Sequence, residues 1–137
     1  MTPSIEVTGT PDPALVAAVT AGLVAANHAG VGPSDRRALG VFARGEALLG
    51  GLVGYTAWGW LYVERLWVAD AARGRGLAAL LLDAAESEAR SRGCRAAWID
   101  TFSSVARRVY ERAGFEVFGT LPDFPPGHTR WFLRKAL

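Results

Sequence analysis

The sequence has 137 residues, of which 50% are hydrophobic and 20% are charged. This length and composition predict one globular domain over residues 1–137, large enough to bury a core without disulfides, and they exclude a disordered chain. The formal net charge is +2 and the basic residues are scattered, which argues against a nucleic-acid-binding protein.

The chain carries few signals for disulfides, metals or export. Cys94 is the one cysteine, which excludes a disulfide within one chain and favours a reducing compartment. His28 and His128 have no neighbours at metal-ligand spacing, so we expect no metal site. The N-terminus lacks a secretion signal, and the uncharged stretch 47–63, interrupted by glycines, fits two buried strands better than a membrane span. We therefore predict a cytoplasmic protein without membrane contact.

The first thirty residues predict a short strand followed by a helix. Ile5 and Val7 flank a polar residue, as in a strand. Asp12 suits a helix N-cap and Pro13 the first helical position. The apolar residues Leu15, Val16, Val19 and Leu23 are expected to form a stripe that packs in the domain.

Three strands without intervening helices come next, which predicts an antiparallel meander. The strands are expected at 39–44, 47–57 and 59–68, with turns at Gly45-Glu46 and near Gly59. In the third strand, Tyr62, Glu64, Leu66 and Val68 alternate with Val63, Arg65 and Trp67. This period predicts a strand with two differently used faces.

After Val68 the pattern changes to strand, helix, strand. A helix is expected from Gly76 to Arg92 and a strand at 95–101, parallel to the third strand because the crossover is helical. A short helix at 105–113 capped by Ser104 and two strands at 115–121 and 129–137 follow. The predicted fold class is mixed α/β: a meander, a β-α-β unit, and a C-terminal helix with two strands.

The turn that opens the helix at Gly76 is suited to bind phosphate, because its glycines admit close approach and the helix N-terminus presents free N–H groups. It lacks the nucleoside-triphosphate loop pattern. Gly74-x-Gly76-x-x-Ala79, with Asp100 ending the next strand, matches a dinucleotide fingerprint weakly, but the preceding meander and the short chain argue against that. A turn without ligand is the third alternative.

Two motifs resemble the GNAT superfamily of acyl-CoA-dependent N-acetyltransferases. Arg73-Gly74-Arg75-Gly76-Leu77-Ala78 matches its Arg/Gln-x-x-Gly-x-Gly/Ala signature, and SSVARRVYERAGFEV is similar to its helix with Tyr110 before the Gly114-Phe115 step. The resemblance extends from about residue 50 to the C-terminus. It implies a GNAT-like fold, acetyl-CoA as co-substrate, and a turn at 73–78 that holds the pyrophosphate.

The same resemblance implies further cofactor contacts. Main-chain groups of Leu66, Trp67 and Val68 would pair with the pantetheine arm where two parallel strands splay apart, and their side chains should mostly be core. Ser103 stands where the family often has a cofactor-contacting Asn, although capping of the helix explains it equally well.

The implied chemistry is direct attack of a primary amine on the thioester in a ternary complex. By resemblance Tyr110 would protonate the leaving thiolate; the alternative is a Tyr that packs its ring against the sheet and keeps its hydroxyl in water. Glu64, predicted to share a strand face with Leu66 and Val68, is the first candidate base, with a structural ion pair as the alternative and Asp100 as second choice. The acceptor stays open.

Two further alternatives concern the whole protein. A non-catalytic acyl-CoA-binding or regulatory module would keep the turn without an acceptor site. The tryptophans, Trp58 and Trp60 above all, make a homodimer plausible, because large exposed aromatics mark interfaces.

Overall fold

The computed structural model describes residues 2–137. The chain divides into two compact units, Met1–Ser34 and Asp35–Leu137, which we describe in turn. The prediction of a single domain therefore stays a prediction.

The N-terminal unit contains one helix, α1 (Pro13–Val31). As predicted, Asp12 caps it, accepting a hydrogen bond from the Ala14 N–H at 2.9 Å, and a proline opens it. The predicted first strand is wrong: Ile5 and Val7 lie in no regular structure and are 86% and 93% exposed. Two apolar residues bury too little surface to hold a strand that pairs with no neighbour.

Within the unit Met1–Ser34, the apolar residues of α1 form no packed stripe. None of its residues is buried, and Val19 is 72% exposed. Alanine, valine and leucine surround the helix, so they mark no single face. Among the described residues, α1 is the one helix whose length and mean hydropathy of 1.6 would suit a membrane span. The uncharged stretch 47–63, which we compared with a membrane span, forms strands as expected.

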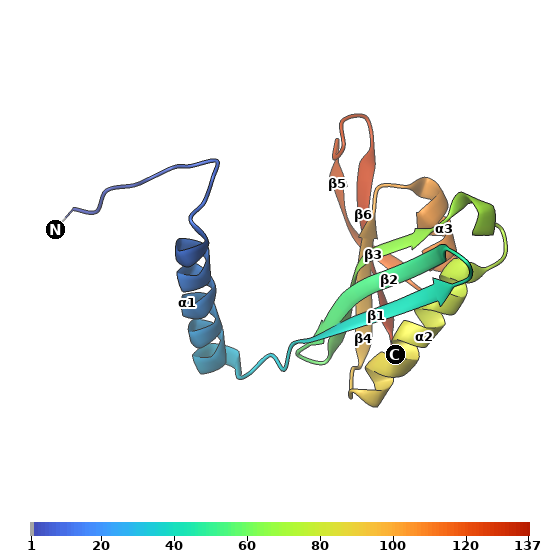
Figure 1. Ribbon diagram of the computed structural model, residues 1–137, viewed down its shortest axis with the longest axis horizontal. Coiled ribbons are helices and arrows are strands. Elements are labelled where there is room, and N and C mark those ends of the chain that lie inside the picture. Colours follow the sequence, from blue (N-terminus) through green and yellow to red (C-terminus); the bar gives the residue numbers. More distant parts are fainter. Residues whose placement is uncertain (1) are drawn as a thin grey trace. The chain divides into compact units, whose positions relative to one another are not determined.

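The second unit is built on a mixed sheet of six strands in the order β1-β2-β3-β4-β6-β5 (Figure 1). The strands are β1 (Arg37–Arg44), β2 (Leu48–Ala57), β3 (Trp60–Val68), β4 (Ala96–Thr101), β5 (Glu116–Pro122) and β6 (Thr129–Ala136). The helices are η1 (Asp70–Ala72), α2 (Leu77–Ser91) and α3 (Ser104–Arg112). The meander and the parallel β3–β4 pair confirm the predicted fold class. A dinucleotide fold would not begin with such a meander.

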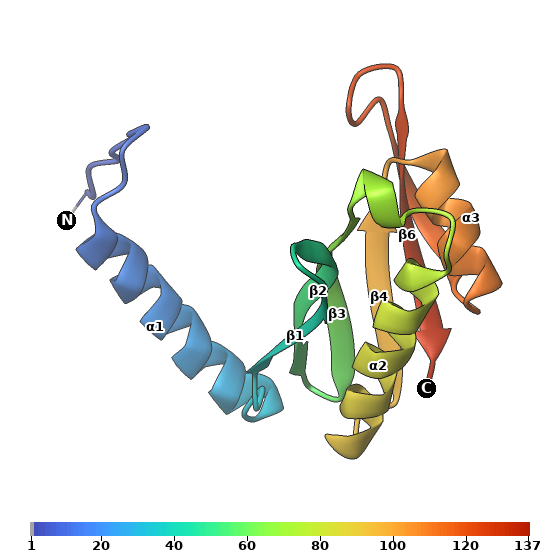
Figure 2. The ribbon, with the colours of Figure 1, turned by 45° about the vertical axis from the view of Figure 1, so that its right-hand side comes forward.

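Both α2 and α3 lie on one face of the sheet (Figure 2). Between them and the strands lies the core, which includes Leu52, Leu61, Leu82, Ile99 and Leu133, each at most 2% exposed. Within Asp35–Leu137 no helix covers the opposite face. Aromatic rings lie there instead: Tyr62 stacks on Trp98 at 3.9 Å and meets Tyr55 edge-on at 5.5 Å.

A bulge in β3 reverses the predicted alternation of faces. Gly54 pairs with Val63 and Val53 with Arg65, so that Glu64 is an extra residue. Leu61 and Val63 are buried before the bulge, whereas Leu66 and Val68 pack on the core after it. The prediction that one unbroken alternation runs through the strand is wrong, because periodicity assumes an uninterrupted ladder.

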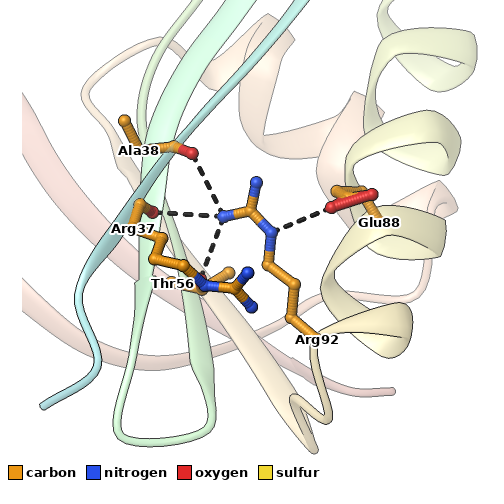
Figure 3. Close-up of polar contacts among 5 residues, drawn as sticks. All are labelled: Arg37, Ala38, Thr56, Glu88 and Arg92. Carbon is orange, nitrogen blue, oxygen red and sulfur yellow. Dashed lines mark hydrogen bonds and ion pairs between the residues drawn. The ribbon is translucent and has the colours of Figure 1, made fainter.

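Arg92 fastens the end of α2 to the first two strands (Figure 3). One guanidinium nitrogen, Nη1, donates to the carbonyls of Arg37 and Ala38 at 3.2 and 3.1 Å and to the Thr56 hydroxyl at 3.1 Å. Its Nε pairs with Glu88 at 2.9 Å. Because the side chain is only 14% exposed, these charge-assisted bonds help to hold the helix against the sheet.

Candidate active site

The turn between β3 and α2 has the conformation that its glycines predict. Gly74 and Gly76 have φ values of 77° and 71°, in the left-handed region that favours glycine. No side chain caps α2, and its first backbone hydrogen bond joins the Leu80 N–H to the Gly76 carbonyl at 3.2 Å. The N–H groups of the first helical turn are therefore available to an anion.

Two cations flank these N–H groups. Arg73 is held by an ion pair with Asp70 at 3.1 Å and by a hydrogen bond from its Nε to the Val68 carbonyl at 3.3 Å. Arg75 is exposed and makes no ion pair with another described residue. The turn can thus add positive charge to its backbone donors.

The parallel strands separate beyond the bulge. The β3–β4 pairing runs from Trp60–Ala96 to Val63–Ile99 and then stops, whereas β3 remains paired with β2 as far as Val68–Gly50. The β4-facing main-chain edge of residues 64–68 is therefore not used by the sheet. This is the wedge that the resemblance implied.

A cavity of about 430 Å³ occupies the wedge. It is lined by Val63, Glu64, Arg65, Leu66, Trp67, Ile99, Asp100, Thr101, Phe102, Tyr110 and Arg130. Tyr110 belongs to the core on the helix face, whereas Asp100 contacts Tyr62, whose ring lies on the open face. The cavity therefore reaches residues of both faces.

Five residues predicted from the sequence meet in this cavity: Glu64, Leu66, Trp67, Asp100 and Tyr110. Val68, the turn at 73–78 and Ser103 do not line it. The expectation of core side chains at 66–68 is right for Leu66 and Val68, but Trp67 is 51% exposed. The bulge explains this, because it sets the faces of all residues that follow.

Tyr110 is buried on α3, with 6% of its surface exposed. Burial, and next the negative charge of Asp100, raise its pKa from 10.0 to about 12. At neutral pH this hydroxyl is therefore a proton donor, which is the state that the predicted role requires.

Glu64 is exposed at the bulge and makes no hydrogen bond or ion pair with another described residue. The structural ion pair that was the alternative role for Glu64 is therefore not formed with any described residue. The predicted face is also wrong, because the bulge separates Glu64 from the core positions of Leu66 and Val68.

Asp100, the second choice from the sequence, holds a polar cluster at the end of β4. Its Oδ1 accepts a hydrogen bond from the Tyr62 hydroxyl at 3.2 Å, and its Oδ2 pairs with Arg130 Nη1 at 3.1 Å. The Arg130 guanidinium lies 4.1 Å from the Phe124 ring centroid and 5.3 Å from that of Phe102. Burial, and next Asp100, raise the pKa of Tyr62 to about 12, so its hydroxyl stays a donor.

Sequence reasoning missed Arg130, Tyr62 and Phe102 as site residues. Arg130 reaches the cavity because β6 pairs antiparallel with β4, which places the start of β6 beside the end of β4. That order, with β6 between β4 and β5, cannot be read from residue types. The sequence held one signal for Arg130: an arginine at the start of a predicted strand, directly after a proline-rich loop.

Ser103, and not Ser104, caps α3: its hydroxyl oxygen accepts from the Ala106 N–H at 3.2 Å. Its own O–H can still donate to a ligand. Cys94 is buried outside the cavity, and burial raises the pKa of its thiol, so it is no candidate nucleophile. Among residues 2–137, no cluster of His, Cys, Asp or Glu could hold a metal.

Comparison with known proteins gives a consistent result. The model of the Acetyltransferase (GNAT) family matches residues 16–115, which extends the resemblance beyond the two motifs toward the N-terminus. Acetyltransferase Atu2258 of Agrobacterium fabrum is 49% identical over 115 residues, which are 82% of this chain and 84% of that protein. Blasticidin-S acetyltransferase of Streptomyces morookaense is 44% identical over 95 residues, 69% of each chain.

Solved structures agree. The crystal structure of an acetyltransferase from Agrobacterium tumefaciens superposes with a TM-score of 0.92 at 43% identity, covering 98% of this chain and 99% of that one. A streptothricin acetyltransferase of Bacillus anthracis, solved with acetyl coenzyme A, shares the fold at 18% identity and a TM-score of 0.60, over 66% of this chain and 57% of its own. This chain belongs to the GNAT family of acetyltransferases.

Proposed function

We propose that this acetyltransferase transfers an acetyl group from acetyl-CoA to a primary amine by direct attack in a ternary complex. The observation that carries the proposal is the cavity at the open end of the β3–β4 pair. It brings a buried, protonated tyrosine and two carboxylates beside an unpaired strand edge.

The residues of the turn and the wedge fit acetyl-CoA. In our proposal the first-turn N–H groups of α2 and the Arg73 and Arg75 side chains bind the pyrophosphate. Main-chain groups of Leu66, Trp67 and Val68 bind the pantetheine amides at the free edge of β3. Ser103 donates its hydroxyl hydrogen to the same ligand while it caps α3.

Within the cavity the reaction needs an acid, a proton acceptor and an oxyanion donor. The amine nitrogen attacks the thioester carbonyl carbon, and the main-chain N–H near Val68 stabilises the oxyanion. As the C–S bond breaks, Tyr110 donates its proton to the leaving thiolate. The proton lost from nitrogen passes to Glu64 or to water and from there returns to the Tyr110 phenolate, leaving an amide and free CoA.

For the acceptor, the relative named blasticidin-S acetyltransferase makes blasticidin S the first amine to test. A small-molecule amine is therefore our first proposal, ahead of polyamines and protein amines. A cytoplasmic location and a homodimer are proposed on the sequence grounds given above; fractionation and size-exclusion chromatography test them.

Thermal unfolding of the purified protein with acetyl-CoA, CoA and NAD tests the cofactor. A ligand that binds only the native state raises the midpoint as its concentration rises, so acetyl-CoA and CoA should raise it and NAD should not. Thiol release from acetyl-CoA is then measured across an amine panel that includes blasticidin S. A midpoint rise without thiol release on any amine would identify a non-catalytic acyl-CoA-binding module; no rise at all would refute the proposal.

A further inference from the structure

The two carboxylates of the cavity have unlike surroundings. Glu64 is exposed at the bulge and pairs with no described residue. The Asp100 side chain is only 16% exposed, and both of its oxygens are engaged. One carboxylate is free to move, and the other is fixed in place.

Asp100 is fixed by partners that are themselves held by aromatic stacking. Tyr62 donates to Oδ1 from β3, and its ring stacks on Trp98 with planes 14° apart. Arg130 pairs with Oδ2 from β6 and lies over Phe124. Each carboxylate oxygen offers two lone pairs and uses one for these partners, so Asp100 can still accept a hydrogen bond from a ligand.

Both carboxylates share the cavity with Tyr110, but only Asp100 is held at a fixed place in it. The negative charge of Asp100 also contributes to the raised pKa of Tyr110. In the tetrahedral intermediate the attacking nitrogen and the departing sulfur are bonded to the same carbon. A group that binds the nitrogen must therefore lie near the acid that serves the sulfur, and Asp100 meets this condition.

The faces of the sheet give the direction of approach. Tyr110 and the helices lie on the core face, whereas Asp100 joins Tyr62 and Trp98 on the face that no helix of Asp35–Leu137 covers. The cavity reaches residues of both faces. An amine bound at Asp100 and a thioester bound at Tyr110 would therefore reach the same cavity from opposite faces.

We propose that Asp100 is the catalytic residue that binds the attacking amine, accepting a hydrogen bond from its N–H and stabilising the positive charge that develops on nitrogen as the C–N bond forms. Tyr62 and Arg130 are positioning residues that hold the carboxylate. This inference rests on the proposed function and deepens it. The nitrogen then loses its proton to Glu64 or water as described above.

The test compares Asp100→Asn with Glu64→Gln, two near-isosteric changes that each remove one negative charge from the cavity. For each variant, kcat and KM for the amine and the midpoint rise caused by acetyl-CoA are measured. We expect Asp100→Asn to lower kcat/KM for the amine by ~10²-fold and to keep the midpoint rise caused by acetyl-CoA, which we call the acetyl-CoA response. Glu64→Gln should lose tenfold or less, on the order expected when water can replace the base.

Two further variants separate chemistry from structure. Asp100→Glu keeps the charge and should restore part of kcat/KM, which a purely structural role would not require. Tyr62→Phe removes one support but leaves the carboxylate, so it should raise KM for the amine more than it lowers kcat.

Specific outcomes overturn the inference. A larger loss in Glu64→Gln than in Asp100→Asn would transfer the role to Glu64 and leave the proposed function intact. Loss of the acetyl-CoA response in Asp100→Asn, without rescue by Asp100→Glu, would make Asp100 structural. A wild-type protein that turns over no amine would refute the proposed function itself.

Discussion

The two ends of the β3–β4 pair are built from the same strands but serve different purposes. At the amino end, Trp60 to Val63 pair with Ala96 to Ile99, and Leu61, Val63, Ala97 and Ile99 are buried. At the carboxyl end the hydrogen-bonded ladder stops and the cavity begins. Glu64, Asp100 and Arg130 are among the residues that line it.

One inserted residue accompanies the change. The bulge at Glu64 shifts the register between β2 and β3 at the point where β3 leaves β4. The closed end can therefore follow the rule of alternating apolar residues, while the open end carries polar groups on a rigid frame. A core and a site can therefore share one pair of strands when a bulge separates them.

The largest effect should come from Tyr110, the proposed acid at the open end. Tyr110→Phe removes the proton donor and keeps the ring, so turnover should fall by ~10²- to 10⁴-fold while acetyl-CoA affinity changes little. Steady-state kinetics and the acetyl-CoA midpoint rise measure both. Unchanged turnover would remove Tyr110 from the mechanism.

Gly54→Ala should damage the closed end and the bulge together. A Cβ at Gly54 would clash with the Tyr62 carbonyl oxygen across the β2–β3 ladder. Overpacking of this kind costs about 1–3 kcal/mol of unfolding free energy. The matched control is Gly119→Ala in β5, where a Cβ meets nothing within 4 Å. Urea unfolding of both variants measures the difference in stability, and equal midpoints would contradict a clash at Gly54.

Arg92→Met tests the link between α2 and the meander. The change keeps most of the aliphatic stem but removes hydrogen bonds to Arg37, Ala38 and Thr56, and we expect a loss of about 1–3 kcal/mol. Arg108→Met is the control, because Arg108 is exposed and makes no ion pair with another described residue. Similar unfolding curves for the two variants would count against this role of Arg92.

A moderate effect should appear at alkaline pH. The pKa of Tyr110 is about 12 in the folded chain and 10.0 for an ordinary tyrosine. Between these two values the unfolded chain holds fewer protons at Tyr110 than the folded chain does. The contribution of Tyr110 to the free energy of unfolding is therefore complete below pH 10 and is lost as the pH rises toward 12. Urea unfolding at about pH 8 and about pH 11 should show a smaller loss for Tyr110→Phe than for the wild type. Equal losses of unfolding free energy in the two proteins would contradict the raised pKa of Tyr110 as the cause.

The smallest effect concerns the phosphate turn. Asp70 pairs with Arg73 and adds a negative charge beside the expected pyrophosphate. Asp70→Asn should therefore tighten acetyl-CoA binding, by up to about fivefold for exposed side chains. Isothermal titration calorimetry measures this, with Asp83→Asn on the exposed side of α2 as control. Weaker binding in Asp70→Asn would mean that Asp70 helps to orient Arg73.

Local sequence determined most of the elements in this protein. The change of period at Gly76, the glycines of the turn and the Asp12-Pro13 start each act through neighbouring backbone, so their structures could be predicted. Ser103 and Ser104 show the limit of that reasoning, because two adjacent serines are equally good caps until the helix start is fixed. The GNAT motifs likewise predict the roles of Tyr110 and of the turn, which the variants above test.

Only the tertiary structure decided which carboxylate is fixed and where the strands part. The bulge at Glu64 and the placement of β6 beside β4 depend on pairing between residues far apart in the chain. Periodicity cannot register an extra residue in a ladder, and residue types do not give strand order. For that reason the sequence placed Glu64 on the wrong face, left Arg130 unnoticed and could not show Asp100 held between Tyr62 and Arg130.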